Sequence, residues 1–181
     1  MQFAGKILLA SALFLSACSS VEVRTDHDNS VDFSRYTTYA WKQLPATSYP
    51  LMDNRIVAAV DGQLFNKGWR RVPEMQAQTI LAASVTTREG QRVDTVHNNW
   101  GGPGMHGWGW GGPVMSTARV VSYTVGTLVL DLYDAQSHNA IWRGTASDVL
   151  WNNPQRLKKS LDKGVKGMFD KFPPGIARVS R

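Results

Sequence analysis

Alternating apolar and polar positions between residues 126 and 146 predict two antiparallel strands joined by a short loop. If Asp134 pairs with Ala140 across a loop of five residues, one face of the pair carries only apolar or small side chains. These are Leu128, Leu130, Leu132, Trp142, Gly144 and Ala146. On the other face the same register places Asp131 opposite Arg143, as a structural ion pair. A slip of one residue would move Arg143 among the leucines, so the pattern favours this register.

Two other segments repeat apolar residues every three or four positions, which predicts amphipathic helices that lie on a sheet. The first helix has Asp53 as its N-cap, continues to about Lys67 and stops at Gly68. Its buried residues are expected to be Ile56, Val60 and Leu64. Asn153 caps the second helix, and Pro154 occupies its first position. Its predicted buried stripe comprises Leu157, Leu161, Val165, Met168 and Phe172.

Shorter runs of β-branched and aromatic residues predict the remaining strands. They cover residues 21–24, 32–41, 69–72, 79–88 and 119–125. Glu89-Gly90-Gln91 is predicted to be a turn, and residues 98–113, with seven glycines and three tryptophans, an irregular loop. The order of these elements predicts an α+β domain of two layers, with a mostly antiparallel sheet and two helices on one face. The pattern leaves the spatial order of the strands open.

The first seventeen residues have the layout of an export signal, with Lys6 followed by an apolar run from residue 7 to residue 15. This run is shorter than the roughly twenty apolar residues that span a bilayer. The sequence Leu15-Ser16-Ala17-Cys18 resembles a bacterial lipobox, which implies cleavage before Cys18 and its acylation with palmitate or a similar chain. Cys18 is the only cysteine and therefore cannot form an internal disulfide. A noncleaved signal or a buried thiol is the alternative interpretation.

Removal of the signal, residues 1–17, would leave residues 18–181 as one domain that begins close to its lipid, because a strand is predicted from residue 21. By resemblance to lipoprotein sorting in enteric bacteria, Ser19 implies the inner leaflet of the outer membrane, with the domain in the periplasm. Loss of Lys6 lowers the formal net charge from +6 to +5. This surplus suits solubility, lipopolysaccharide, phospholipid head groups or peptidoglycan, whereas scattered cations argue against nucleic acid as a partner.

The sequence has no pattern of catalytic residues, so we expect no enzyme activity and no cofactor. No serine occupies a nucleophile elbow, and the carboxylates are scattered singly. Asp94, His97 and His106 lie within thirteen residues and offer metal ligands, but their spacing matches no familiar site. We assign no metal, and keep as the alternative function a metal- or small-lipid-binding protein that uses the loop near His97 and His106. His27 and His138 are expected in turns at the surface.

The glycine-rich loop contains the most suggestive side chains for binding, Trp100, Trp108 and Trp110. Exposed tryptophans could stack on sugars of peptidoglycan or lipopolysaccharide, enter a lipid interface, or contact an envelope protein. The other interpretation is that they fold back over the sheet, because large apolar side chains seldom remain in water.

Short motifs spread over nearly the whole mature chain resemble a family of bacterial lipoproteins catalogued as domain of unknown function 4136. The motifs are Asp32-Phe33-Ser34 with Tyr36, Thr38, Tyr39, Ala40 and Trp41; Arg55-Ile56; Lys67-Gly68-Trp69; Gly126-Thr127-Leu128 with Asp131; Trp142-Arg143-Gly144 with Ala146; and Phe172-Pro173-Pro174. The resemblance implies an outer-membrane lipoprotein and names no activity. The leading hypothesis is a noncatalytic periplasmic module that binds a protein partner or another envelope component through its tryptophan loop.

Overall fold

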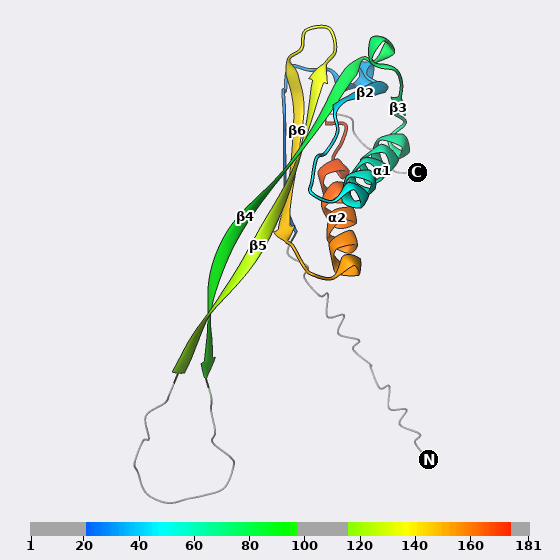
Figure 1. The fold of residues 1–181 in the computed structure, drawn as a ribbon. Helices are drawn as coiled ribbons and strands as arrows, with labels where there is room; N and C mark the ends of the chain where they lie inside the picture. Colours follow the sequence, from blue (N-terminus) through cyan, green and yellow to red (C-terminus); the bar gives the residue numbers. More distant parts are fainter. Residues whose placement is uncertain (1–20, 98–115, 175–181) are drawn as a thin grey trace, which may run out of the picture.

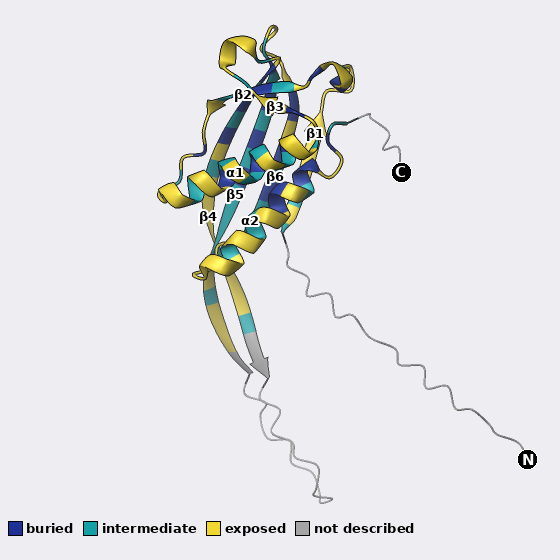
Figure 2. Cartoon of the chain, turned by 90° about the vertical axis from the view of Figure 1, so that its right-hand side faces the viewer, coloured by how far each residue is buried: buried dark blue, intermediate teal, exposed yellow. Residues whose placement is uncertain are grey.

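In a computed structural model, which describes residues 21–97 and 116–174, six strands form one mixed sheet and two helices cover one of its faces (Figures 1 and 2). The strands are β1 (Glu22–His27), β2 (Thr38–Gln43), β3 (Arg70–Arg71), β4 (Thr79–His97), β5 (Ser116–Asp134) and β6 (Ala140–Val149). The helices are α1 (Pro50–Asn66) and α2 (Pro154–Phe169), and two short 3-10 turns, η1 and η2, span Phe33–Arg35 and Glu74–Gln76.

The strand order is β1-β6-β5-β4-β2-β3. β1, β6, β5 and β4 are successively antiparallel, whereas β2 runs parallel to both β4 and β3. The parallel β2–β3 pair follows from the helix between them, because a strand can return in the same direction only through a crossover connection. The predicted two-layer α+β fold, with a mostly antiparallel sheet and both helices on one face, is confirmed.

The register predicted for the β5–β6 hairpin is confirmed except beside its loop. Leu128 faces Ala146, Asp131 faces Arg143, and the agreement continues through Leu132. Beyond that point the prediction is wrong, because Tyr133 and not Asp134 pairs with Ala140. The shift is a β-bulge, in which one strand contributes an additional residue, and it allows the consecutive Ile141 and Trp142 both to be buried.

The strand predicted over residues 32–41 is shorter than expected. The Asp32 carboxylate accepts a hydrogen bond from the Ser34 backbone N–H at 2.9 Å, and the chain forms the turn η1 before β2 begins at Thr38. A short acidic side chain favours such a turn because it offers the backbone N–H an alternative to a strand partner. The turn places Phe33 in the core, where its side chain is buried.

Both helices form where they are predicted, but one detail differs. Asp53 does not cap α1, which begins at Pro50; its carboxylate instead accepts a hydrogen bond from the Thr47 N–H at 2.9 Å. Proline suits this first position because it has no N–H to satisfy. The predicted end of α1 is confirmed, since Gly68 has a φ of +83°, which favours glycine. The predicted cap of α2 is confirmed as well, since Asn153 accepts a hydrogen bond from the Arg156 N–H.

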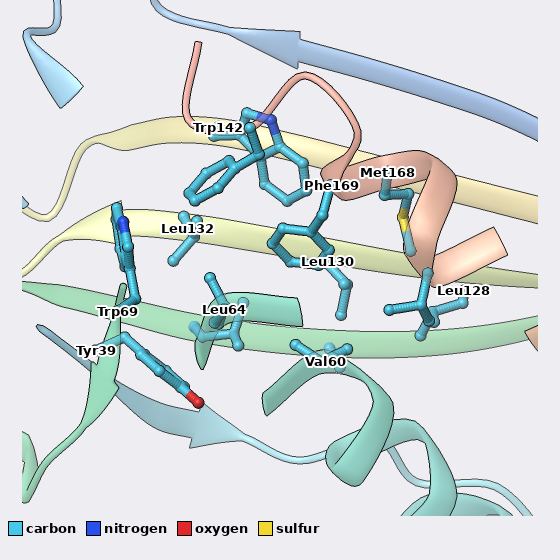
Figure 3. Packing of buried hydrophobic residues seen from close by; sticks show 14 of the residues in the cluster. Tyr39, Val60, Leu64, Trp69, Leu128, Leu130, Leu132, Trp142, Met168 and Phe169 are labelled. Carbon is cyan, nitrogen blue, oxygen red and sulfur yellow. The ribbon is translucent and has the colours of Figure 1, made fainter. Parts of the chain in front are cut away.

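The core lies between the sheet and the helices and draws side chains from both layers (Figure 3). Leu130 and Leu132 from β5 meet Val60 and Leu64 from α1, and all four are fully buried. From α2 the fully buried residues include Phe169, which the predicted stripe omits. α2 can lie this close to the sheet because it has glycine at position 164, where an added Cβ would come within 2.9 Å of the Ala146 Cβ. No helix of the described chain is long and apolar enough to cross a membrane.

Candidate interaction surface

β4 and β5 continue far beyond the other strands as a twisted two-stranded ribbon (Figure 1). In chain order the first residue of β5 that pairs with β6 is Val125, and β2 reaches along β4 no farther than Ala82. We call residues 89–97 and 116–124 the arm. Within the described chain the two strands of the arm pair with each other and with no other strand. The predicted turn at residues 89–91 is therefore wrong, because β4 runs straight through it.

Glycine occurs inside this long strand because an aromatic ring lies across it. Gly90 faces Tyr123 in the β4–β5 register, and an added Cβ on Gly90 would lie 2.6 Å from Cζ of the Tyr123 ring. Glycine weakens a strand, and a neighbouring aromatic ring that covers it offsets part of that loss. In local sequence, a glycine between polar residues indicates a turn. Tyr123 lies too far from Gly90 in the sequence for a local pattern to reveal that the two residues pair.

The arm presents both apolar and charged side chains to its surroundings. Val93 and Val120 face each other across the two strands and are 60% and 59% exposed. By alternation they lie on the same face as Leu128, so they continue the core face beyond the part that the helices cover. Arg92 and Asp94 form an exposed ion pair, with 2.7 Å between Nε and Oδ1. Exposed apolar side chains beside charged ones are typical of a surface that contacts another molecule. Nothing in the described part of the chain covers the Val93–Val120 pair.

A second feature, at the end of the sheet opposite the arm, is an open depression of about 890 Å³. It lies between the turn η2 and the loop that joins β5 to β6. The residues that line it include Arg35, Tyr36, Lys42, Ile80, Tyr133 and Asp134. Lys42 is held by Glu74, whose Oε1 lies 2.6 Å from the lysine Nζ. The depression thus offers an apolar floor with cations at its edge.

Asp134 is the buried acid of this depression, and its carboxylate stabilises the β5–β6 loop. Oδ2 accepts the Tyr36 hydroxyl at 2.7 Å, and Oδ1 accepts the backbone N–H groups of Gln136 and Ser137 at 3.0 and 2.7 Å. The bond from Tyr36, followed by those from Ser137 and Gln136, lowers the pKa of Asp134 to about 2. Burial and the bond to Asp134 raise the pKa of Tyr36. Both carboxylate oxygens are engaged in structural bonds, which does not suit a general base.

A comparable acid joins α1 to the sheet. Asp61 Oδ1 accepts the Tyr39 hydroxyl at 2.7 Å and the Trp41 indole N–H at 2.8 Å, and Oδ2 lies 3.2 Å from Nη1 of Arg71. Burial, followed by the bond to Asp61, raises the pKa of Tyr39. Tyr39 and Trp41 therefore share the face of β2 that α1 covers. Asp61 was not predicted as a structural residue; the available signal was an acid on the sheet-facing margin of an amphipathic helix.

The other predicted site residues fall partly outside the described chain. Cys18, the three loop tryptophans and His106 lie there, so their assignments stay predictions. His97 ends β4, and Asp94 is engaged with Arg92. Over residues 21–97 and 116–174, no three His, Cys, Asp or Glu side chains are grouped to hold a metal ion. His27 and His138 are exposed as predicted, although His27 ends β1 and does not lie in a turn.

The ion pair predicted between β5 and β6 is confirmed, and its expected contribution to stability is small. Asp131 accepts two hydrogen bonds from Arg143, at 2.5 Å from Nε and 2.9 Å from Nη2. These bonds raise the pKa of the Arg143 guanidinium, but its side chain is 62% exposed. We expect Asp131→Ala and Arg143→Ala to be coupled by about 0.2 to 1 kcal/mol in a double-mutant cycle of chemical denaturation. Strictly additive effects would contradict the pair.

Comparisons with known proteins agree with this fold. Residues 23–174 match the family model of a domain of unknown function, DUF4136. No curated protein matches the chain at a significant level.

Three solved structures align with most of this chain. A PDZ domain protein from Parabacteroides distasonis aligns over 87% of this chain, with a TM-score of 0.55 and 12% identity, and the alignment spans 37% of that protein's length. A PelC dodecamer from Paraburkholderia phytofirmans aligns over 82% of this chain and 94% of its own, with a TM-score of 0.49 and 13% identity. A putative neuraminyllactose-binding hemagglutinin homolog from Helicobacter pylori aligns over 77% of this chain and 86% of its own, with a TM-score of 0.43 and 11% identity. At 12% identity, the first of these alignments shows a likeness of fold alone.

Proposed function

The chain belongs to the DUF4136 family of domains of unknown function, and from that premise we propose that it is an outer-membrane-anchored periplasmic lipoprotein that binds an envelope component without catalysing a reaction. The lipobox-like sequence that ends at Cys18 supports the anchor. The carboxylates of Asp61 and Asp134, both engaged in structural bonds, support a role that does not involve catalysis.

The arm is the observation that carries this proposal. An isolated two-stranded hairpin is marginally stable in water, because it has no layer against which to bury a face. The arm nevertheless exposes the Val93–Val120 pair and leads directly in sequence to the segment with Trp100, Trp108 and Trp110. A long ribbon whose sequence continues into aromatic residues suits a contact with a component outside the domain.

The first step of the test concerns the anchor. In cells we expect the chain to incorporate palmitate and to fractionate with the outer membrane, and Cys18→Ser to lose both, because the thiol is the predicted acylation site. Ser20→Ala is the matched control, since it changes a neighbouring small residue and leaves the cysteine. An unchanged location of the Cys18→Ser variant would end the lipoprotein proposal.

The second step asks whether the folded domain has a partner. Unlipidated Cys18→Ser protein is used in pull-down from solubilised envelopes, beside the same protein with all three tryptophans replaced by alanine. We expect retention to fall in the triple variant while its thermal midpoint stays nearly unchanged, because exposed side chains contribute little to folding. A loss of about 3 to 5 kcal/mol per tryptophan would instead indicate burial over the sheet. Calorimetric titration with divalent metals tests the alternative function near His97 and His106.

A further inference from the structure

The arm lies at the end of the domain where the chain enters its first strand. β1 and β5 are both antiparallel to β6, so they run in the same direction. Glu22, the first residue of β1, faces Ser147, which in turn faces Thr127 of β5. The part of β5 that precedes Thr127 becomes the arm and extends away from the body (Figure 1). The arm therefore points toward the side from which the segment that begins at Cys18 must arrive.

The arm is much longer than the tether. Glu22 is four residue steps from Cys18, a distance of at most about 14 Å at full extension. Thr127 is eleven residue steps from Ser116, and at about 3.3 Å per step the strand spans roughly 36 Å. Once acylated, Cys18 lies at the membrane surface, and Glu22 lies within the tether length of it. If the strands stand upright with the arm toward the membrane, the arm reaches into the bilayer, and if they lie along the membrane, the arm runs beside its surface.

An orientation in which the arm points away from the membrane is unfavourable. From Thr127 to the end of β5 at Asp134 the body extends seven residues the other way, or roughly 23 Å. That length also exceeds the tether, so turning the arm away from the membrane would drive the body into the lipid. The body ends there in the charged depression lined by Arg35 and Lys42, whose burial in lipid is costly.

The side chains of the arm suit an interfacial position. The Val93–Val120 pair is apolar and exposed on the face that continues the core, and on the opposite face Tyr123, at 37% exposure, has a ring that suits the depth of the lipid head groups. On that opposite face Arg119, like Arg92 beside Asp94, can lay its aliphatic stem along lipid while its guanidinium group stays among the phosphates.

We propose that the arm rests in the interfacial region of the same membrane that anchors the chain, so that this lipid surface is the envelope component bound by the arm. The inference rests on the proposed lipid anchor. Anchor and arm together fix the domain at two points and set its orientation relative to the membrane.

A single new cysteine on the arm tests this contact. Cys18 is consumed by acylation, so the thiol of Val120→Cys in the full lipidated chain can be labelled alone with a polarity-sensitive fluorophore. The matched control is Met75→Cys, because Met75 is 100% exposed in η2 at the opposite end of the body. In vesicles of phosphatidylethanolamine and phosphatidylglycerol we expect the emission of the label at position 120 to shift to shorter wavelength. A quencher attached to the lipids should remove most of its fluorescence intensity. The label at position 75 should do neither.

Each failure has its own signature. Protein that does not float with the vesicles overturns the anchor and this inference together. Protein that floats but whose label at position 120 matches the water-exposed label at position 75 overturns the inference and leaves the anchor intact. A shift that occurs only after envelope proteins are added assigns the arm to a protein partner and overturns the lipid contact. Val93→Cys, on the facing strand, repeats the measurement if Val120→Cys fails to fold.

Discussion

Replacing Phe169 with alanine is expected to lower the free energy of unfolding by about 3 to 5 kcal/mol, the usual loss for a buried aromatic side chain. Phe169 is fully buried and stacks on Trp142, with 5.3 Å between ring centroids and 29° between ring planes. It also meets the edge of Phe172 at 5.3 Å. The truncation removes these contacts and leaves a cavity where α2 packs on β6 (Figure 3). For a domain of ordinary stability this is a large fraction of the total.

Phe65→Ala is the matched control, because it removes the same atoms from a side chain that is 73% exposed on α1. Chemical denaturation of the two variants should separate them clearly, with Phe65→Ala within about 0.5 kcal/mol of the parent protein. Equal losses in the two variants would show that α2 does not pack on the sheet through Phe169.

The hairpin between residues 126 and 146 could be predicted because both of its faces constrain one register. A slip would have buried Arg143 and separated it from Asp131, so local sequence contained the answer. The bulge could not be predicted, because it depends on space in the core for both Ile141 and Trp142. Helical spacing likewise located α2 but missed Phe169, whose burial depends on where Trp142 and Phe172 lie.

The arm was missed for a related reason. Gly90 is a turn signal by itself, and only its pairing with Tyr123 turns it into a strand residue. The pairing of β4 with β5 over this length depends on the sequences of both strands, and the sequence of either strand alone does not predict it. The strands were predicted to end at residue 88 and to resume at residue 119, so the length of the arm was missed at both strands. Asp134 illustrates the same limit, since its partner Tyr36 lies 98 positions away in the sequence.

Replacing Asp134 with alanine is expected to destabilise the protein by roughly 2 to 4 kcal/mol, because it leaves the Tyr36 hydroxyl and two backbone N–H groups without their acceptor. Asp134 is 8% exposed, so water compensates for little of this loss. Asp134→Asn retains the shape and one acceptor oxygen and should cost less. Asp170→Asn, on an exposed acid, is the control and should change stability by less than about 0.5 kcal/mol.

The pH dependence of stability tests how much of the contribution of Asp134 depends on its charge. Its pKa is about 2 in the folded protein, below the ordinary 3.8, so folding favours the ionised form. The resulting contribution, roughly 1 to 2 kcal/mol, is complete above the unfolded pKa and disappears as the pH falls from about 4 to about 2. The difference in unfolding free energy between the parent protein and Asp134→Asn should therefore shrink over that window. A difference that stays constant from pH 5 to pH 2, measured by denaturant titration, would mean that the hydrogen bonds of Asp134 act without its charge.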